Sequence, residues 1–407
     1  MRSVSFSAAV KPLFFVLCVC GVYSPPFRCS KKWWYILAKI LSVLVETLCC
    51  GSLVVSLVGQ IIMTLSLGIT VLYNVSFTLG EIVLLVTFHC FCRKSFRVFF
   101  EEFEAYQKEH CRRDAKYKGV FILGIVNVFL VVVSLCSAFY WASLPFSIAQ
   151  CQLGYLELPE LFGKIMCHPV AYGIVIFFST HVYGAVFFLY LTIWKALKTE
   201  ANDIVEKFTK IDKLTLRETP EVIENFRLRH ADLCHVINAA NRFMTHILAA
   251  FYGAGITCML LLIHGMISQG YGVSYLIDLG QLFFIFVFYL ITITLTGVSL
   301  NLKMHEPVDF LFRLDVHRMT GTGSDIVSMF LSRVQGAPIG FHVYHLFTVD
   351  TSTVMMICGT LLTYALVIVQ FQPVATVQQS ASSSTEQPMM SSSTYAEHSE
   401  RFNNTPF

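Results

Sequence analysis

The stretch Val120–Ala142 reads VFILGIVNVFLVVVSLCSAFYWA and contains no charged residue. A helix needs about 20 apolar residues to cross a hydrocarbon core of roughly 30 Å. The whole chain shares this character, because 55% of its 407 residues are hydrophobic, only 14% are charged and the mean hydropathy is +0.64. These values exclude an ordinary water-soluble domain and a chain that is disordered over most of its length.

Six further apolar stretches of similar length flank this one. They are Ile36–Val58, Thr70–Cys92, Val170–Ile193, His246–Ile267, Leu279–Leu302 and Leu346–Phe371. None alternates with the period of two that a membrane β-barrel requires, and backbone amides in lipid must be satisfied within the segment. The predicted fold class is therefore all-α, with seven transmembrane helices.

The basic residues predict the orientation of these helices. All but three of the 29 lysines and arginines lie before the first apolar stretch or in every second loop after it. Because Lys and Arg accumulate on the cytoplasmic side, the N-terminus is expected inside and the C-terminus outside. A shorter apolar run, Pro12–Tyr23, has the length of a signal-peptide core, but a cleaved signal would invert this arrangement.

Four residues on the predicted outer side are candidates for covalent modification. Asn74 and Asn403 stand in glycosylation sequons. Cys151 and Cys167 lie in the outer loop 145–168, where an oxidising environment would preserve a disulfide, although both thiols could equally stay free.

Two cytosolic segments mix apolar and charged residues at helical spacing, at about 195–245 and 303–340. They are expected to extend the spanning helices into a compact intracellular bundle, with a turn near Pro220. After Phe371 the chain becomes rich in Ser and Gln, so residues 373–407 are predicted to form a disordered extracellular tail.

Catalytic and nucleic-acid-binding functions find little support in the sequence. No phosphate-binding loop, nucleophile elbow or paired-carboxylate motif is present, so neither an enzyme nor a cofactor is predicted. A net charge of +3 argues against nucleic acid as a partner. Histidines on the cytosolic side are possible metal ligands, but their spacing is incomplete for a metal site: His230, His235, His342 and His345.

Polar residues inside the predicted spans are costly in lipid and normally face a cavity or a partner helix. Those expected in the outer halves of the second to sixth helices form a polar and aromatic set suited to a small polar ligand. The alternative is that they bond one helix to another. The set comprises Glu81, Tyr140, Trp141, Tyr172, His264, Asp278 and Gln281.

The last apolar stretch ends in the nine residues TYALVIVQF, Thr363–Phe371. This resembles the TYhhhhhQF motif (h, hydrophobic) of the arthropod gustatory receptor family, which is related to insect odorant receptors. Further segments resemble the same family's fifth helix and the lead-in to its last helix: Leu233–Asn238 with Asn241, Pro338–Phe341 and His345–Asp350.

The resemblance implies a ligand-gated, non-selective cation channel in the plasma membrane of sensory neurons. A small tastant, such as a sugar or a bitter compound, would open a homo- or hetero-tetramer formed with other gustatory receptors and surrounded by membrane lipid. Residues 1–32 would be a cytosolic segment, 33–372 the receptor-channel domain and about 346–371 the pore helix. The cytosolic bundle would anchor the subunits.

Three residues of the motif are expected to line and gate this pore. Val367, Gln370 and Phe371 stand at i, i+3 and i+4 and share one helix face, with Thr363 and Tyr364 near the same stripe. Rings of Val367 and Phe371 could close the pore by excluding water, while the Gln370 amides offer polar contacts to a hydrated ion.

Two features depart from the family pattern. Ala365 follows Tyr364 where many sugar receptors carry a glutamate, and the tail after Phe371 is unusually long. The main alternative is a G-protein-coupled receptor, which would need the opposite orientation and whose Asp-Arg-Tyr and Asn-Pro-x-x-Tyr motifs this sequence lacks. A membrane-embedded metal enzyme ranks third.

Overall fold

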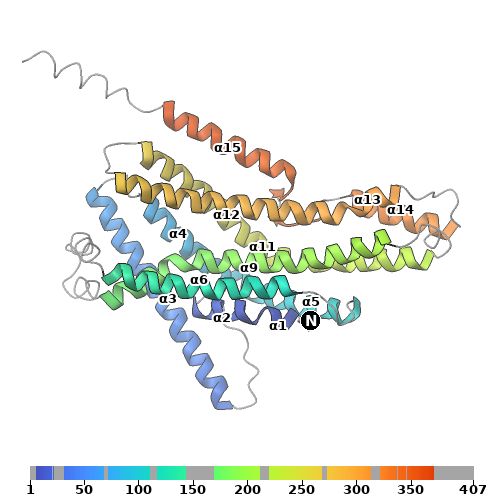
Figure 1. Ribbon diagram of the computed structural model, residues 1–407, viewed down its shortest axis with the longest axis horizontal. Coiled ribbons are helices and arrows are strands. Elements are labelled where there is room, and N and C mark those ends of the chain that lie inside the picture. The colour runs from blue at the N-terminus through green and yellow to red at the C-terminus, as the bar shows by residue number, and fades with distance from the viewer. Residues whose placement is uncertain are drawn as a thin grey trace, which may run out of the picture. The chain divides into compact units, whose positions relative to one another are not determined.

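A computed structural model describes residues 6–20, 22, 32–67, 72–110, 117–143, 169–210, 220–267, 273–312, 321–336, 338–344 and 346–370. These residues form helices and one two-stranded hairpin (Figure 1), which confirms the predicted fold class. The chain divides into two units, Met1–Ala365 and Leu366–Phe407. The first unit holds every element except the end of the last helix.

The elements follow one another along the chain. They are α1 (Phe6–Ala9), α2 (Lys11–Val19), α3 (Lys32–Leu67), α4 (Leu72–Thr87), the π-helix η2 (Phe88–Cys92), α5 (Arg93–His110), α6 (Lys118–Ser143), α9 (Pro169–Lys210), α11 (Pro220–Ile267), α12 (Val273–His305), α13 (Pro307–Phe312), α14 (Gly321–Gln335), β1 (His342–Val343), β2 (Phe347–Thr348) and α15 (Thr351–Gln370).

Among the described residues, six helical stretches are long and apolar enough to cross a membrane. They fall in α3, α4 to α5, α6, α11, α12 and α15. Each coincides with a predicted span. The remaining prediction, Val170–Ile193, lies within α9, which begins at Pro169 and continues to Lys210. Helices α9 and α11 thus run far beyond their apolar parts, as the amphipathic sequence next to those parts predicted.

The second predicted span continues without a break into a charged helix. Helices α4, η2 and α5 follow one another directly from Leu72 to His110. The π-helical turn lies where the apolar sequence ends and Arg93 begins the polar part. Beyond it, α5 buries Phe96, Phe99 and Phe103 and exposes charged side chains.

The short N-terminal apolar run is part of the core. Helix α2 packs against α6 and α9 and buries Leu13, Val16 and Leu17. A Cβ atom at Gly124 would lie 3.0 Å from the Cβ atom of Pro12, so glycine allows the close approach of α6 and α2. The run is too short to span a membrane, and its apolar side chains are buried against longer helices instead.

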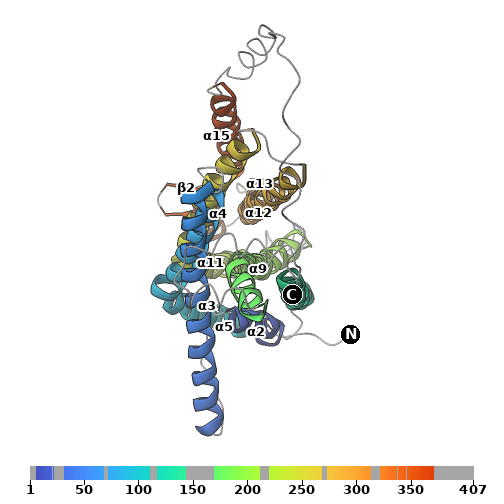
Figure 2. The ribbon, with the colours of Figure 1, turned by 90° about the vertical axis from the view of Figure 1, so that its left-hand side faces the viewer.

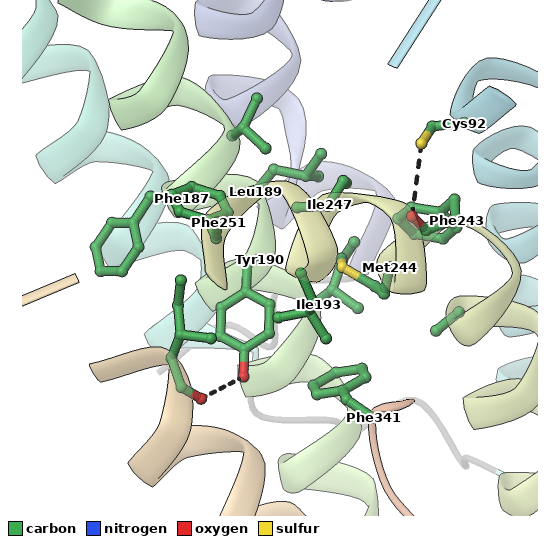
Figure 3. Packing of buried hydrophobic residues seen from close by; sticks show 14 of the residues in the cluster. Cys92, Phe187, Leu189, Tyr190, Ile193, Phe243, Met244, Ile247, Phe251 and Phe341 are labelled. Carbon is green, nitrogen blue, oxygen red and sulfur yellow. Dashed lines mark hydrogen bonds between the residues drawn. The ribbon is translucent and has the colours of Figure 1, made fainter. Parts of the chain in front are cut away.

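The main core is built where α9, α11 and α12 meet. Figure 3 shows Tyr190 and Ile193 of α9 beside Ile247 and Phe251 of α11. The hydroxyl of Tyr190 is buried and donates a hydrogen bond to the carbonyl of Ile293, at 2.8 Å. Helix α3 contacts α4 and α9 and runs obliquely to α9 (Figures 1 and 2). The hydrogen bond of the Tyr190 hydroxyl therefore joins α9 to α12 inside the apolar cluster.

A second, smaller core joins the parts of the chain that were predicted to lie in the cytosol. It brings together α9, α11, α13 and α14 through Phe208, Ile223, Leu311, Val327, Phe330 and Val334. Beside it, Arg229 of α11 donates hydrogen bonds to Asp203, at 2.6 Å, and to the buried carboxylate of Glu200, at 3.4 Å. The predicted amphipathic segments do form one packed bundle; its anchoring role remains a prediction.

Candidate functional site

Helix α15 carries the motif residues and is mostly exposed. Only 11% of its membrane-length window is buried. Among its described side chains, only Thr353 and Ile357 are buried. The exposed ones are both apolar, such as Met355 and Leu362, and polar, such as Thr363 and Gln370. Within a single chain this helix has few packing partners.

Four of the five predicted pore residues lie on the last turns of α15. Thr363, Tyr364, Val367 and Gln370 are all exposed. The hydroxyl of Thr363 donates to the carbonyl of Gly359 at 2.8 Å, which satisfies its polar group within the helix. The fifth residue, Phe371, lies outside the described residues.

The start of this helix corrects the sequence-based boundary. We expected a helix from Leu346, but α15 begins at Thr351. The residues before it form an antiparallel hairpin in which His342 pairs with Thr348 and Val343 with Phe347. The prediction of the boundary was wrong because an apolar run alone does not distinguish a short strand from a helix.

Asp350 ends the hairpin and caps the helix. Its carboxylate accepts hydrogen bonds from the Thr353 amide, at 3.0 Å, and the Ser352 hydroxyl, at 2.7 Å. The first of these bonds satisfies a backbone N–H that the first turn of a helix leaves free. The two bonds also lower the pKa of the Asp350 carboxyl, chiefly through the Ser352 hydroxyl. The Thr353 hydroxyl donates to the Thr348 carbonyl at 2.7 Å and ties the cap to β2.

The hairpin is fixed to the helices around it by two asparagines. The Asn241 amide donates to the carbonyl of Gly340 at 2.8 Å, and its oxygen accepts the His342 N–H at 3.3 Å. Asn301 of α12 donates to the carbonyl of Ile339 at 3.2 Å. Two segments that resembled the family, around Asn241 and Gly340, are thus in direct contact.

The hairpin also approaches α12 very closely. A Cβ atom at Gly297 would lie 2.5 Å from Val349 Cγ1, so a larger residue there would displace the lead-in to α15. Phe341 packs its ring 5.4 Å from that of Tyr190. The base of α15 is therefore positioned by α9, α11 and α12 together.

The predicted ligand-binding residues are only partly placed. Glu81 is fully buried, whereas His264 and Gln281 are exposed. Tyr140, Trp141, Tyr172 and Asp278 lie in α6, α9 and α12, but their side chains are outside the described part of the structure. A shared ligand cavity therefore remains a prediction.

Glu81 has polar neighbours that the sequence did not single out. Both of its carboxylate oxygens are buried without a hydrogen-bond partner among the described residues, and so is the hydroxyl of Tyr183. Glu81 interacts electrostatically with Tyr183 of α9, Tyr289 of α12 and Cys49 of α3. These residues come from helices far apart in the sequence, so local patterns could not reveal that they share one electrostatic environment.

Three of the four histidines considered as metal ligands have other partners. His230 is buried against the carbonyl of Met304, at 3.1 Å, and His235 lies 3.6 Å from Glu102. His342 contacts the Thr348 hydroxyl at 2.8 Å. No group of three potential metal ligands occurs in the described part of the chain, and His345 lies outside it.

The candidates for covalent modification are not placed by the structure. Cys151, Cys167 and Asn403 lie outside the described residues. Asn74 falls within α4, and its side chain is also outside them. Their predicted modifications remain predictions.

Known structures share this fold. Two structures of the insect olfactory receptor OR5 from Machilis hrabei match 89% of this chain and 98% of theirs. The structure in complex with eugenol has a TM-score of 0.61 at 15% identity, and the other has 0.64 at 14%. At this identity the likeness establishes the fold alone.

A search by sequence identifies the family. No curated protein matches the chain. The profile of the 7tm chemosensory receptors matches residues 10–374, which include every described residue from Val10 to the end of α15. With its membrane-length helices, this match makes the chain a multi-pass plasma-membrane receptor rather than an enzyme, and a member of the seven-transmembrane chemosensory receptor family.

Proposed function

We propose that this chemosensory receptor is a ligand-gated, non-selective cation channel whose pore is lined by α15 from each of four subunits. The supporting observation is the surface of α15. It is apolar enough to span the membrane, is only 11% buried and exposes the amide of Gln370 among its apolar residues. Because polar groups are costly against lipid, part of this helix is expected to face water or other copies of the chain.

The last turns supply the parts of a gate. Val367 and Gln370 are both exposed and one turn apart, and Phe371 is the next residue. Four copies around an axis would place rings of Val367 and Phe371 across the pore, where apolar side chains exclude water when the rings are close. No acidic ring accompanies them, in keeping with weak discrimination among cations.

The stimulus is proposed to be a small tastant, such as a sugar or a bitter compound, detected by sensory neurons. The related OR5 was determined in complex with the small molecule eugenol. A ligand in an outer cavity near Glu81 would open the pore only if it bound the open state more tightly than the closed state. The subunits could be identical or be other gustatory receptors.

Replacing the gate residue tests the channel without knowledge of the ligand. Phe371→Ala should raise the resting cation current, measured by patch recording in transfected cells. The matched control is Phe129→Ala, which shortens an exposed phenylalanine on α6. An unchanged resting current in Phe371→Ala, at equal surface expression, would contradict the gate.

The orientation is tested by epitope tags. A tag after Phe407 should be stained on intact cells, and a tag at Met1 should require permeabilised cells. Staining of only the N-terminal tag on intact cells would reverse the orientation and remove the basis for an outer gate at Phe371.

A further inference from the structure

A pocket of about 520 Å³ lies between α11 and the β1–β2 hairpin, apart from the motif residues and from Glu81. Its lining can supply many hydrogen-bond donors, and Arg242 is the one lining residue with a permanent charge. The lining consists of Asn238, Asn241, Arg242, Thr245, His342, Tyr344, Phe347 and Thr348.

The walls of this pocket are held in place before any ligand arrives. Tyr344 adopts a left-handed backbone conformation, with φ 48°, at the tip of the hairpin. Its N–H donates to the Thr245 hydroxyl, and its own hydroxyl pairs with His246 Nδ1 at 2.8 Å. Together with the two bonds of Asn241, these contacts fix the tip against α11 and reduce the entropy lost on binding.

The guanidinium of Arg242 is available to a ligand. Its side chain is 56% exposed, and its ion-pair partner Glu102 lies 4.0 Å away, at the limit of such a contact. Glu102 also lies 3.6 Å from His235. A guanidinium carries five N–H donors, so this single long contact leaves most of them unused.

The pocket lies at the level where the second spanning helix becomes charged. The Cys92 thiol donates to the carbonyl of Phe243 at 3.5 Å (Figure 3). The Phe91 ring stacks on His246, with 5.4 Å between the ring centres. The transition from η2 to α5 is therefore next to the pocket-forming turns of α11.

Basic and apolar side chains are both exposed at this level. Arg93 and Lys94 begin α5 and are exposed. Phe91, at 60%, and Leu346, at 78%, are exposed apolar residues, the first stacked on His246 of α11 and the second in the turn between β1 and β2. In the proposed orientation this level is the cytosolic surface of the membrane, where anionic lipids concentrate.

We propose that this pocket binds the phosphorylated headgroup of an anionic lipid of the inner leaflet. A planar guanidinium forms paired hydrogen bonds to phosphate oxygens, and the exposed amide of Asn238 in the lining would serve a further oxygen. The exposed apolar side chains beside the pocket suit acyl chains, which favours a lipid over a free phosphate ester. The inference rests on the orientation in the proposed function but not on ion conduction.

Binding can be measured on the full-length protein in detergent, with fluorescent dioctanoyl phosphatidylinositol 4,5-bisphosphate as the probe and dioctanoyl phosphatidylcholine as the competitor that should fail. Arg242→Gln should weaken binding about five- to tenfold. Arg242→Lys should weaken it less, because the charge remains but the paired donors are lost. Lys210→Gln is the matched control, since it removes a charge that is 72% exposed and pairs with Glu206 on α9.

Asn238→Leu, which removes an exposed lining amide, provides a second variant and should weaken binding by a smaller factor. Equal affinity of wild type, Arg242→Gln and Asn238→Leu would overturn the proposal, as would competition by phosphatidylcholine. Competition by soluble inositol 1,4,5-trisphosphate as strong as that by the intact lipid would overturn the lipid assignment. None of these results depends on current, so they are distinct from a failure of the channel.

Discussion

Helices α6 and α15 are both apolar, long enough to span a membrane and little buried, at 17% and 11% of their windows. Their exposed surfaces differ. After Lys118, the exposed residues of α6 up to Cys136 are apolar, and its one amide, Asn127, is buried. Helix α15 exposes Thr363 and Gln370 among its apolar residues.

A helix can be exposed in a single chain for two reasons, and the exposed side chains of α6 and α15 fit different ones. An apolar surface with its polar group turned inward suits contact with lipid, because lipid cannot satisfy an amide. A mixed surface suits contact with water and with other protein chains. The small buried fraction is common to both helices, whereas the identity of their exposed side chains differs and supports the proposal that they have different surroundings.

The strongest test of this comparison puts a charge on α15. Gln370→Arg would place four guanidinium groups around the proposed pore and repel cations. The stimulus-evoked cation current should fall by about tenfold or more, measured by whole-cell recording. Gln370→Asn, which keeps an amide, should conduct normally, and a normal current in Gln370→Arg would show that α15 does not line the pore.

Cysteine substitutions at two similarly exposed positions, one on each helix, test the comparison further. Val367 of α15 and Val126 of α6 are similarly exposed, at 37% and 40%. A membrane-impermeant cationic thiol reagent should alter the current of Val367→Cys severalfold, but not that of Val126→Cys, because only the first position is expected to meet water. Modification of both, or only of Val126→Cys, would contradict the assignment.

The attachment of α15 to the rest of the chain can be weakened at Asn241. Asn241→Leu removes bonds to the Gly340 carbonyl and the His342 amide and should lower the free energy of unfolding by about 2 kcal/mol. Thermal unfolding in detergent measures the change. Asn238→Leu, at an exposed position of the same helix, should leave the melting temperature nearly unchanged; an equal loss in both variants would count against a specific role for Asn241.

The smallest effect is expected from the cap of α15. The pKa of the Asp350 carboxyl is lowered in the folded chain. Its ionised form therefore stabilises the fold at pH values above the ordinary pKa of about 4. This contribution is lost as the pH falls through the lowered pKa of the folded chain. The difference in melting temperature between wild type and Asp350→Asn should therefore shrink below about pH 4. A constant difference between pH 7 and 3 would exclude this linkage.

Much of the fold followed from local sequence. Long apolar runs with few charged residues located the spanning helices, and the mixed pattern after Lys195 predicted that α9 and α11 extend past their apolar parts. The motif at the end of α15 resembles that of gustatory receptors, and the chain belongs to the wider seven-transmembrane chemosensory receptor family. These features depend on composition and helical period, which neighbouring residues determine.

The hairpin and the surroundings of Glu81 could not be predicted from local patterns. The strands β1 and β2 are held in place by Asn241 and Asn301, which are far away in the sequence and bond the backbone just before and at β1. Glu81 and the two tyrosines with which it interacts electrostatically, Tyr183 and Tyr289, lie on three separate helices. The capping residue Asp350 was visible in the sequence and could have located the start of α15.

The length of helix α11 determines how far its ends move when it tilts. It runs without interruption from Pro220 to Ile267, 48 residues, which corresponds to a rod about 72 Å long. A bilayer core of about 30 Å accounts for less than half of this length. Tilting such a rod by about 5° about one end would carry the other end through about 6 Å. Small rearrangements at one end of α11 are thereby converted into displacements as large as a helical turn at the other.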